Sequence, residues 1–118
     1  MLIFITGYMA SGKTTLGKRL AGELNYRFLD LDDLIENQTG RKIEKIFEES
    51  GEHAFREIER IILSEHLEDQ DTVIATGGGA ACYLDNMELM NRHGLTVFLD
   101  VPVEILTARL ISTGLPAN

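Results

Sequence analysis

The chain has 118 residues, a length that fits one domain, and 44% hydrophobic with 25% charged residues is the balance of an ordinary globular protein. Its formal net charge of −8 argues against a general nucleic-acid binder or a membrane-surface binder. The single cysteine, Cys82, excludes an internal disulfide and fits a reducing compartment. Because no apolar run has the length of a membrane span and the first residues do not resemble a signal peptide, we expect a cytoplasmic protein with no membrane partner.

Strand and helix patterns alternate along the chain. An apolar run at 2–6 predicts a buried strand, and the next segment, 12–25, predicts a helix with an apolar face of Leu16, Leu20, Ala21 and Leu24. The further predicted elements are an extended piece at 27–30, helices at 31–38, 43–49 and 52–66, a strand at 72–76, a helix at 84–92, a strand at 96–100 and a helix from Pro102 to about 111. This order predicts an α/β fold with three layers, in which helices cover both faces of a parallel sheet and ligands bind beyond the carboxyl ends of the strands.

Residues 7–14, Gly-Tyr-Met-Ala-Ser-Gly-Lys-Thr, fit the phosphate-loop pattern between a predicted strand and a predicted helix. Backbone N–H groups and the positive end of the helix dipole would point at one phosphate site. Lys13 would reach the outer phosphates of ATP, and the Thr14 hydroxyl would bind magnesium. A chance glycine-rich turn is the alternative, which the correct flanking elements make the weaker interpretation.

Two aspartates follow the second predicted strand. Asp30, at the end of that strand, could hold magnesium directly or through water. Asp32 could be a partner or base for an acceptor hydroxyl, but aspartate is also favoured as a helix N-cap. From the sequence alone the capping interpretation of Asp32 is the favoured one.

A third constellation is Arg56 with Glu59, three residues apart on one face of a predicted helix. The pair could be a surface ion pair of little energetic value. It could also be an arginine fork for a substrate carboxylate, oriented by Glu59. Since Phe55 and Ile58 flank the pair, we expect it at the edge of the buried face, and periodicity does not decide between the two roles.

Three glycines, Gly77, Gly78 and Gly79, come directly after a predicted buried strand. Consecutive glycines cost backbone entropy, and they make sense where the backbone must approach a ligand closely. A flexible turn is the weaker alternative.

Taken together, the motifs resemble those of the shikimate kinase family. The resemblance rests on 7–15, on Phe-Leu-Asp-Leu-Asp at 28–32, on Ile35-Glu36, on Ile46-Phe47, on Gly51-Glu52, on Phe55-Arg56 with Glu59, and on 73–80 with its triple glycine. It covers nearly the whole chain, and the combination is far more specific than the phosphate loop alone. It implies a single phosphate-loop kinase domain over 1–118, with 31–60 as the helical substrate-binding segment.

The resemblance also implies a reaction and site residues. The reaction would transfer the ATP γ-phosphate to the 3-hydroxyl of shikimate, a step of aromatic amino-acid synthesis, with Mg²⁺ as cofactor and a monomer as the usual state. The implied catalytic residues are Lys13 and Asp32, and the implied magnesium ligands are Thr14 and Asp30. ATP would be bound by Ala10, Ser11, Gly12, Lys13, Thr14, Thr15 and Arg109. Shikimate would be bound by Asp32, Arg56, Glu59, Gly77, Gly78 and Gly79, with Arg56 on its carboxylate.

The chain departs from the family pattern at two places. Ala10 stands where the family usually has glycine, and we expect this to tune nucleotide affinity without abolishing function. The chain stops at Asn118, before the lid and the C-terminal part that supply two further arginines in the family. We therefore expect a truncated version of a longer kinase.

Two other functions stay open. One is a related small-metabolite or nucleoside monophosphate kinase, which Asp32, Arg56 and the triple glycine disfavour because they match a carboxylated polyol better than a base. The other is a nucleotide-binding regulatory module without transfer activity, which the missing lid favours and the retained Lys13 and Thr14 disfavour.

Overall fold

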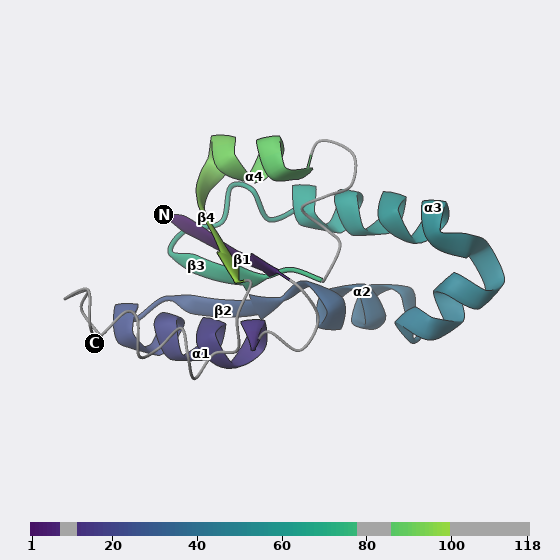
Figure 1. The fold of residues 1–118 in the computed structure, drawn as a ribbon, viewed down its shortest axis with the longest axis horizontal. Helices are drawn as coiled ribbons and strands as arrows, with labels where there is room; N and C mark the ends of the chain where they lie inside the picture. Colours follow the sequence, from purple (N-terminus) through teal and green to yellow (C-terminus); the bar gives the residue numbers. More distant parts are fainter. Residues whose placement is uncertain (8–11, 78–85, 100–118) are drawn as a thin grey trace.

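The computed structural model describes residues 1–7, 12–77 and 86–99 of the chain. Its four strands form one parallel sheet in the order β2-β3-β1-β4, which confirms the predicted sheet (Figure 1). In chain order the elements are β1 (Leu2–Gly7), α1 (Lys13–Leu24), β2 (Arg27–Asp30), α2 (Leu31–Thr39), α3 (Ile43–Ser64), β3 (Thr72–Ala75), α4 (Asn86–His93) and β4 (Gly94–Leu99).

Helices cover both faces of the sheet, as predicted (Figure 1). Alternate residues of β1 point to opposite faces, and neighbouring strands keep them in register, with Ile3 opposite Val73 and Phe4 opposite Ile74. On one face, Ile3 and Val73 pack with Ala21 of α1. On the other face, Phe4 and Ile74 belong to a cluster completed by residues of α2, α3 and α4, namely Leu31, Ile35, Ile46, Phe55, Ile62, Leu63 and Met90. Because helices cover both faces of the sheet, the sequences of β1 and β3 are largely apolar and do not alternate between apolar and polar residues.

The order of the strands creates the place for a ligand site. Helix α1 follows β1 and packs on one face, whereas α4 follows the neighbouring strand β3 and packs on the opposite face. At such a switch point the chain leaves adjacent strands in opposite directions, and a crevice forms beyond their carboxyl ends. Gly7, Asp30 and Gly77 stand at or just after the ends of three neighbouring strands, which places all three at this edge of the sheet.

Most predicted elements agree with the structure to within two residues. The predicted break at Ser50-Gly51 is confirmed: α3 runs on past it, but Gly51 has φ 87° and ψ 171°, a non-helical conformation with positive φ that suits glycine. The assignment of Leu24 to the apolar face of α1 is wrong, because this residue, the last of the helix, is 42% exposed.

The predicted helix from Pro102 lies outside the described residues. No helix in the described part of the chain is long and apolar enough to cross a membrane.

Candidate active site

Lys13, the first residue of α1, reaches back to the end of β1. The Lys13 ammonium donates a hydrogen bond of 3.0 Å to the carbonyl oxygen of Gly7, and Gly12 precedes the helix with φ 88°. Partial burial lowers the pKa of Lys13, while the nearby carboxylates of Asp32 and Asp30 act in the opposite direction. The end of β1 and the start of α1 therefore place a cation beside two carboxylates, between a strand and a helix as a phosphate loop requires.

Thr14 and Asp30 meet between α1 and the end of β2. The Thr14 hydroxyl donates to Asp30 Oδ2 over 3.0 Å, and Asp30 Oδ1 accepts the backbone N–H groups of Asp32 (3.0 Å) and Asp33 (3.3 Å). Asp30 is thus the N-cap of α2, and the favoured interpretation of Asp32 as the cap is wrong. A strand that ends one residue before the helix puts the cap at Asp30 and leaves the Asp32 carboxylate for another role. We call Gly7, Lys13, Thr14 and Asp30 the β1–α1 group.

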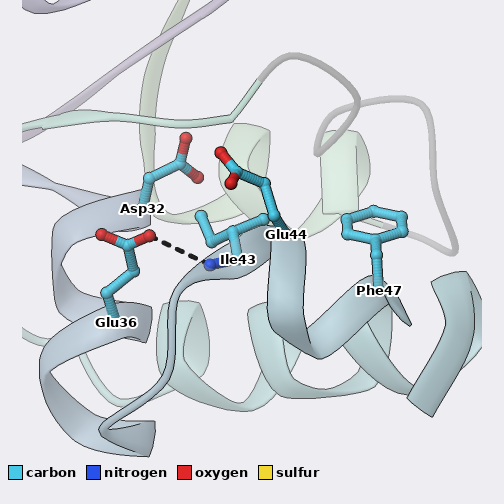
Figure 2. Close-up of a pocket in the computed structure, with 5 residues that line it drawn as sticks. All are labelled: Asp32, Glu36, Ile43, Glu44 and Phe47. Carbon is cyan, nitrogen blue, oxygen red and sulfur yellow. Dashed lines mark hydrogen bonds between the residues drawn. The ribbon is translucent and has the colours of Figure 1, made fainter. Parts of the chain in front are cut away.

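Asp32 stands in the first turn of α2, and its side chain points toward the pocket drawn in Figure 2. Burial is the main cause that raises the pKa of Asp32, and the negative charge of Asp30 raises it further, while Lys13 opposes the shift. A carboxyl group that is partly desolvated next to a lysine is a typical arrangement of a functional site.

The Arg56–Glu59 pair is buried, so its interpretation as a surface ion pair is wrong. Arg56 Nη1 lies 3.0 Å from Glu59 Oε1, and the side chains are 14% and 0% exposed. The expectation that the pair lies at the edge of the buried face is wrong for Glu59, because the structure encloses this side chain completely. Burial raises the pKa of Glu59, and the hydrogen bond from Arg56 opposes the shift.

Gly77 lies against two carboxyl groups. A Cβ atom at this position would lie 2.8 Å from Asp32 Oδ1 and 3.3 Å from Glu59 Oε2. A close approach of the backbone is thus present at Gly77, and any side chain there would displace one of these oxygens. Glu59 Oε2 is fully buried and has no hydrogen-bond partner within the described residues. We call Asp32, Arg56, Glu59 and Gly77 the Gly77 group.

A pocket of about 670 Å³ lies between α2 and the first part of α3. Figure 2 shows the carboxylates of Asp32 and Glu44 turned toward each other across it. Its wall is further supported by Phe47, whose ring packs on Phe55 with 4.7 Å between centroids. The lining residues are Asp32, Glu36, Ile43, Glu44 and Phe47.

The pocket adds residues to which the sequence analysis gave no site role. Glu36 is four residues after Asp32 on α2, so helical spacing places both on one face and could have suggested it. Glu44 and Phe47 gave no such signal, because only the packing of α3 on α2 brings them to the pocket. Ala10, Ser11, Gly78, Gly79 and Arg109 lie outside the described residues, and Thr15 is exposed on α1.

The arrangement suits a magnesium ion with few protein ligands. Thr14 Oγ1 and Asp30 Oδ2, 3.0 Å apart, are hard oxygen donors of the kind that Mg²⁺ prefers. Among the described residues there is no group of three histidine, cysteine or carboxylate side chains that could hold a metal ion by itself. One or two protein oxygens completed by phosphates and water are usual for magnesium in phosphoryl transfer, so the donor set fits.

Comparison with known proteins gives a consistent result. The sequence model of the family described as shikimate kinase matches residues 9–114. A shikimate kinase of Bacteroides fragilis is 56% identical over 108 residues, which are 92% of this chain and 60% of that protein. A shikimate kinase of Bacteroides thetaiotaomicron is 54% identical over 108 residues, 92% of this chain and 62% of the relative. The chain therefore spans less than two thirds of the length of these relatives.

Solved structures agree with the sequence comparison. The crystal structure of shikimate kinase from Bacteroides thetaiotaomicron superimposes with a TM-score of 0.84 at 52% identity, over 94% of this chain and 63% of that one. The shikimate kinase from Acinetobacter baumannii, solved in complex with shikimate, gives a TM-score of 0.82 at 41% identity, over 96% of this chain and 63% of that one.

Proposed function

Because this chain belongs to the shikimate kinase family, we propose that it provides the nucleotide and acceptor sites of an enzyme that phosphorylates the 3-hydroxyl of shikimate with ATP. The observation that carries the proposal is the convergence at Gly77. There, Asp32 and Glu59 present oxygen acceptors beside an arginine, and Lys13 of the β1–α1 group lies close enough to Asp32 to influence its pKa. The relative from Acinetobacter baumannii was solved with shikimate, which supports this choice of acceptor.

The roles follow from the chemistry of the substrates. Shikimate carries a carboxylate and ring hydroxyls, and Arg56 can bind the carboxylate in a two-pronged contact while Glu59 holds the guanidinium in place. Asp32 can accept a hydrogen bond from the reacting hydroxyl and take its proton as the oxygen attacks the γ-phosphorus. The bond between the γ-phosphorus and the β–γ bridging oxygen then breaks, which leaves ADP. Glu59 Oε2, which has no hydrogen-bond partner within the described part of the chain, can accept from a second ring hydroxyl.

On the nucleotide side, Lys13 neutralises charge on the outer phosphates, and the first backbone N–H groups of α1 are donors for phosphate oxygens. Thr14 and Asp30 would hold the magnesium ion, which supplies charge neutralisation on the phosphates when bound. Most of the rate enhancement in phosphoryl transfer comes from positioning and electrostatic stabilisation, for which these residues are suited.

We further propose that efficient turnover needs the part of the relatives that this chain does not span. A closing segment excludes water and supplies cations to the transferring phosphate in such enzymes. The extended form is defined as this chain continued by the C-terminal segment of its Bacteroides fragilis relative. The proposed location is the cytoplasm, which fits the lone Cys82. The proposed state is a monomer, as the resemblance to the family implies.

The decisive experiment is an ADP-release assay with ATP, magnesium and shikimate on the 118-residue chain and on the extended form. Shikimate-dependent ADP release by the extended form, with little or none from the shorter chain, is the expected result. ATP binding without shikimate dependence in both would contradict the acceptor assignment and favour a nucleotide-binding module. Turnover with a nucleoside monophosphate in place of shikimate would favour the other kinase alternative.

Arg56→Ala tests the acceptor site separately. Loss of a hydrogen-bonded charge pair should weaken shikimate binding roughly 10- to 100-fold, the range for contacts with a charged group. ATP affinity should stay within about twofold, since Arg56 does not belong to the β1–α1 group, and isothermal titration of each ligand measures both. Unchanged shikimate affinity with lowered stability alone would restrict Arg56 to a structural role.

A further inference from the structure

The connection from α2 to α3 contains a contact that the proposed reaction does not use. Glu36 Oε2 accepts a hydrogen bond of 3.0 Å from the backbone N–H of Ile43, the first residue of α3 (Figure 2). The other carboxylate oxygen lies 3.8 Å from Lys42 Nζ. Since Glu36 is four residues after Asp32 on α2, one helix face carries both the proposed base and this acceptor.

The contact gives an acceptor to the first backbone N–H group of α3. The first N–H groups of a helix have no acceptor within the helix, and the N-cap residue of α3, Lys42, gives no side-chain cap. Helix α2 is capped by its own Asp30, whereas α3 takes an acceptor from another helix. The first turn of α3 is thus tied to α2 by a charged, 28% exposed carboxylate.

The first part of α3, residues 43–50, is also separated from the rest of the helix. Gly51 interrupts the helical backbone with φ 87° and ψ 171°, so the direction of 52–64 does not dictate that of 43–50. Side-chain contacts must set it instead: Ile46 is buried in the core, and Arg41 pairs with Glu49 at 3.1 Å on the surface. The pocket residues Ile43, Glu44 and Phe47 all belong to this part.

We propose that Glu36 is a positioning residue for the acceptor substrate. By accepting the Ile43 N–H, it fixes residues 43–50 against α2, so that their side chains form the pocket wall opposite Asp32. The inference rests on the proposed function for the identity of the substrate, shikimate. The contact itself can be tested without any substrate.

The test compares three variants of the extended form. Glu36→Ala removes the acceptor while keeping a good helix former in α2, and Glu36→Gln keeps a carbonyl acceptor but not the charge. Lys42→Ala is the matched control, because it removes only the 3.8 Å charge contact of a 79% exposed side chain. We expect Glu36→Ala to weaken shikimate binding about tenfold, or ~1.4 kcal/mol, with a smaller change in kcat. Glu36→Gln should restore most of the affinity, and Lys42→Ala should match the wild type.

Hydrogen exchange of the free protein provides the second readout. Amides of 43–50 should exchange faster in Glu36→Ala than in the wild type, and those of Glu36→Gln should stay protected. Unchanged affinity and exchange in Glu36→Ala would overturn the proposal, as would a Glu36→Gln variant as weak as Glu36→Ala. If the wild type does not bind shikimate, the proposed function fails, while the exchange data still decide whether Glu36 holds this segment.

A backbone variant covers the case in which Glu36→Ala does not fold. Ile43→Pro removes the N–H donor and leaves Glu36 intact, and proline is favoured at the first helical position. Lys42, with φ −66° and ψ 146°, already has the conformation required before proline. Ile43→Val is its side-chain control. Faster exchange of 44–50 and weaker shikimate binding in Ile43→Pro alone support the proposal, and equal behaviour of the two variants overturns it.

Discussion

The β1–α1 group and the Gly77 group are neighbours that are built in opposite ways. Three of the four β1–α1 residues, Gly7, Lys13 and Thr14, come from a single strand-to-helix connection, and the bond from Thr14 to Asp30 is exposed. The Gly77 group joins three distant segments, and its Glu59 is fully buried. A site for a highly charged nucleotide can stay hydrated and local, whereas a site that distinguishes one small polyol requires buried, prearranged polar atoms.

This difference predicts how each group responds to substitution. Exposed polar residues cost little to hold in place, so their loss should affect the reaction and leave the fold almost unchanged. Buried, paired charges are part of the packing, so their loss should affect the fold as well as the reaction. Substitutions in each group can therefore test whether the two groups differ in this way.

Lys13→Ala should lower kcat of the extended form by roughly 10³-fold, the size expected when a charge on the transferring phosphates is lost. Its thermal midpoint should change little, because the ammonium is only half-buried and its hydrogen bond to the Gly7 carbonyl is local. Lys18→Ala, an exposed position on α1, is the control and should behave as the wild type. Near wild-type turnover in Lys13→Ala would contradict the phosphate-loop assignment.

Glu59→Ala should destabilise the protein by about 3 kcal/mol, since it leaves the Arg56 guanidinium buried without this ion-pair partner. Urea denaturation of the wild type and of Glu59→Ala measures this change in the free energy of unfolding. The double variant Arg56→Met with Glu59→Leu should recover most of the stability, because it removes both charges, but should still fail to bind shikimate. A stability of Glu59→Ala equal to that of the wild type would show that the pair is solvated and that the contrast between the groups is wrong.

Gly77→Ala should lower kcat about tenfold, because the new methyl group would lie 2.8 Å from Asp32 Oδ1 and must move that carboxylate. Gly22→Ala in α1 is the matched control, since, outside its own helical turn, no atom of the described residues lies within 4 Å of its Cβ position, and it should raise stability by roughly 0.5–1 kcal/mol. The comparison of kcat and thermal midpoint separates a steric effect at the site from a general effect of alanine. Equal kcat in both variants would mean that Asp32 does not need its present position.

The same contrast explains which features can be predicted from the sequence. The parallel sheet, its two covered faces and the break at Gly51 follow from apolar runs, periodicity and glycine, which are local signals. The cap of α2 is Asp30 and not the predicted Asp32. The predicted start of this helix at residue 31 is confirmed, and a helix that starts there has its N-cap at residue 30, so the error lies in the choice between the two aspartates and not in the helix boundary. Glu59 is four residues after Phe55 and three before Ile62, so helical spacing is compatible with its burial. Spacing alone does not show that a carboxylate there is paired with Arg56 and lies against Gly77, because these contacts depend on packing between distant segments.

The last and smallest effect is the pH dependence of stability that Glu59 of the Gly77 group contributes. Burial holds the pKa of Glu59 above its ordinary value of 4.5 in the folded protein. Well below 4.5 the group is protonated in both the folded and the unfolded states. As the pH rises, the unfolded chain releases the proton first, so folding stability falls until the pH passes the raised pKa.

Glu59→Gln removes this titration. The free energy of unfolding of the wild type minus that of Glu59→Gln should therefore decrease as the pH rises above 4.5 and then level off. Urea denaturation between about pH 4 and pH 8 measures the difference. Groups that do not interact with Glu59 cancel in it, whereas Asp32, whose charge acts on Glu59, contributes to it. An increase of the difference with pH would mean that Arg56 outweighs burial and that Glu59 is more easily ionised than a free glutamate.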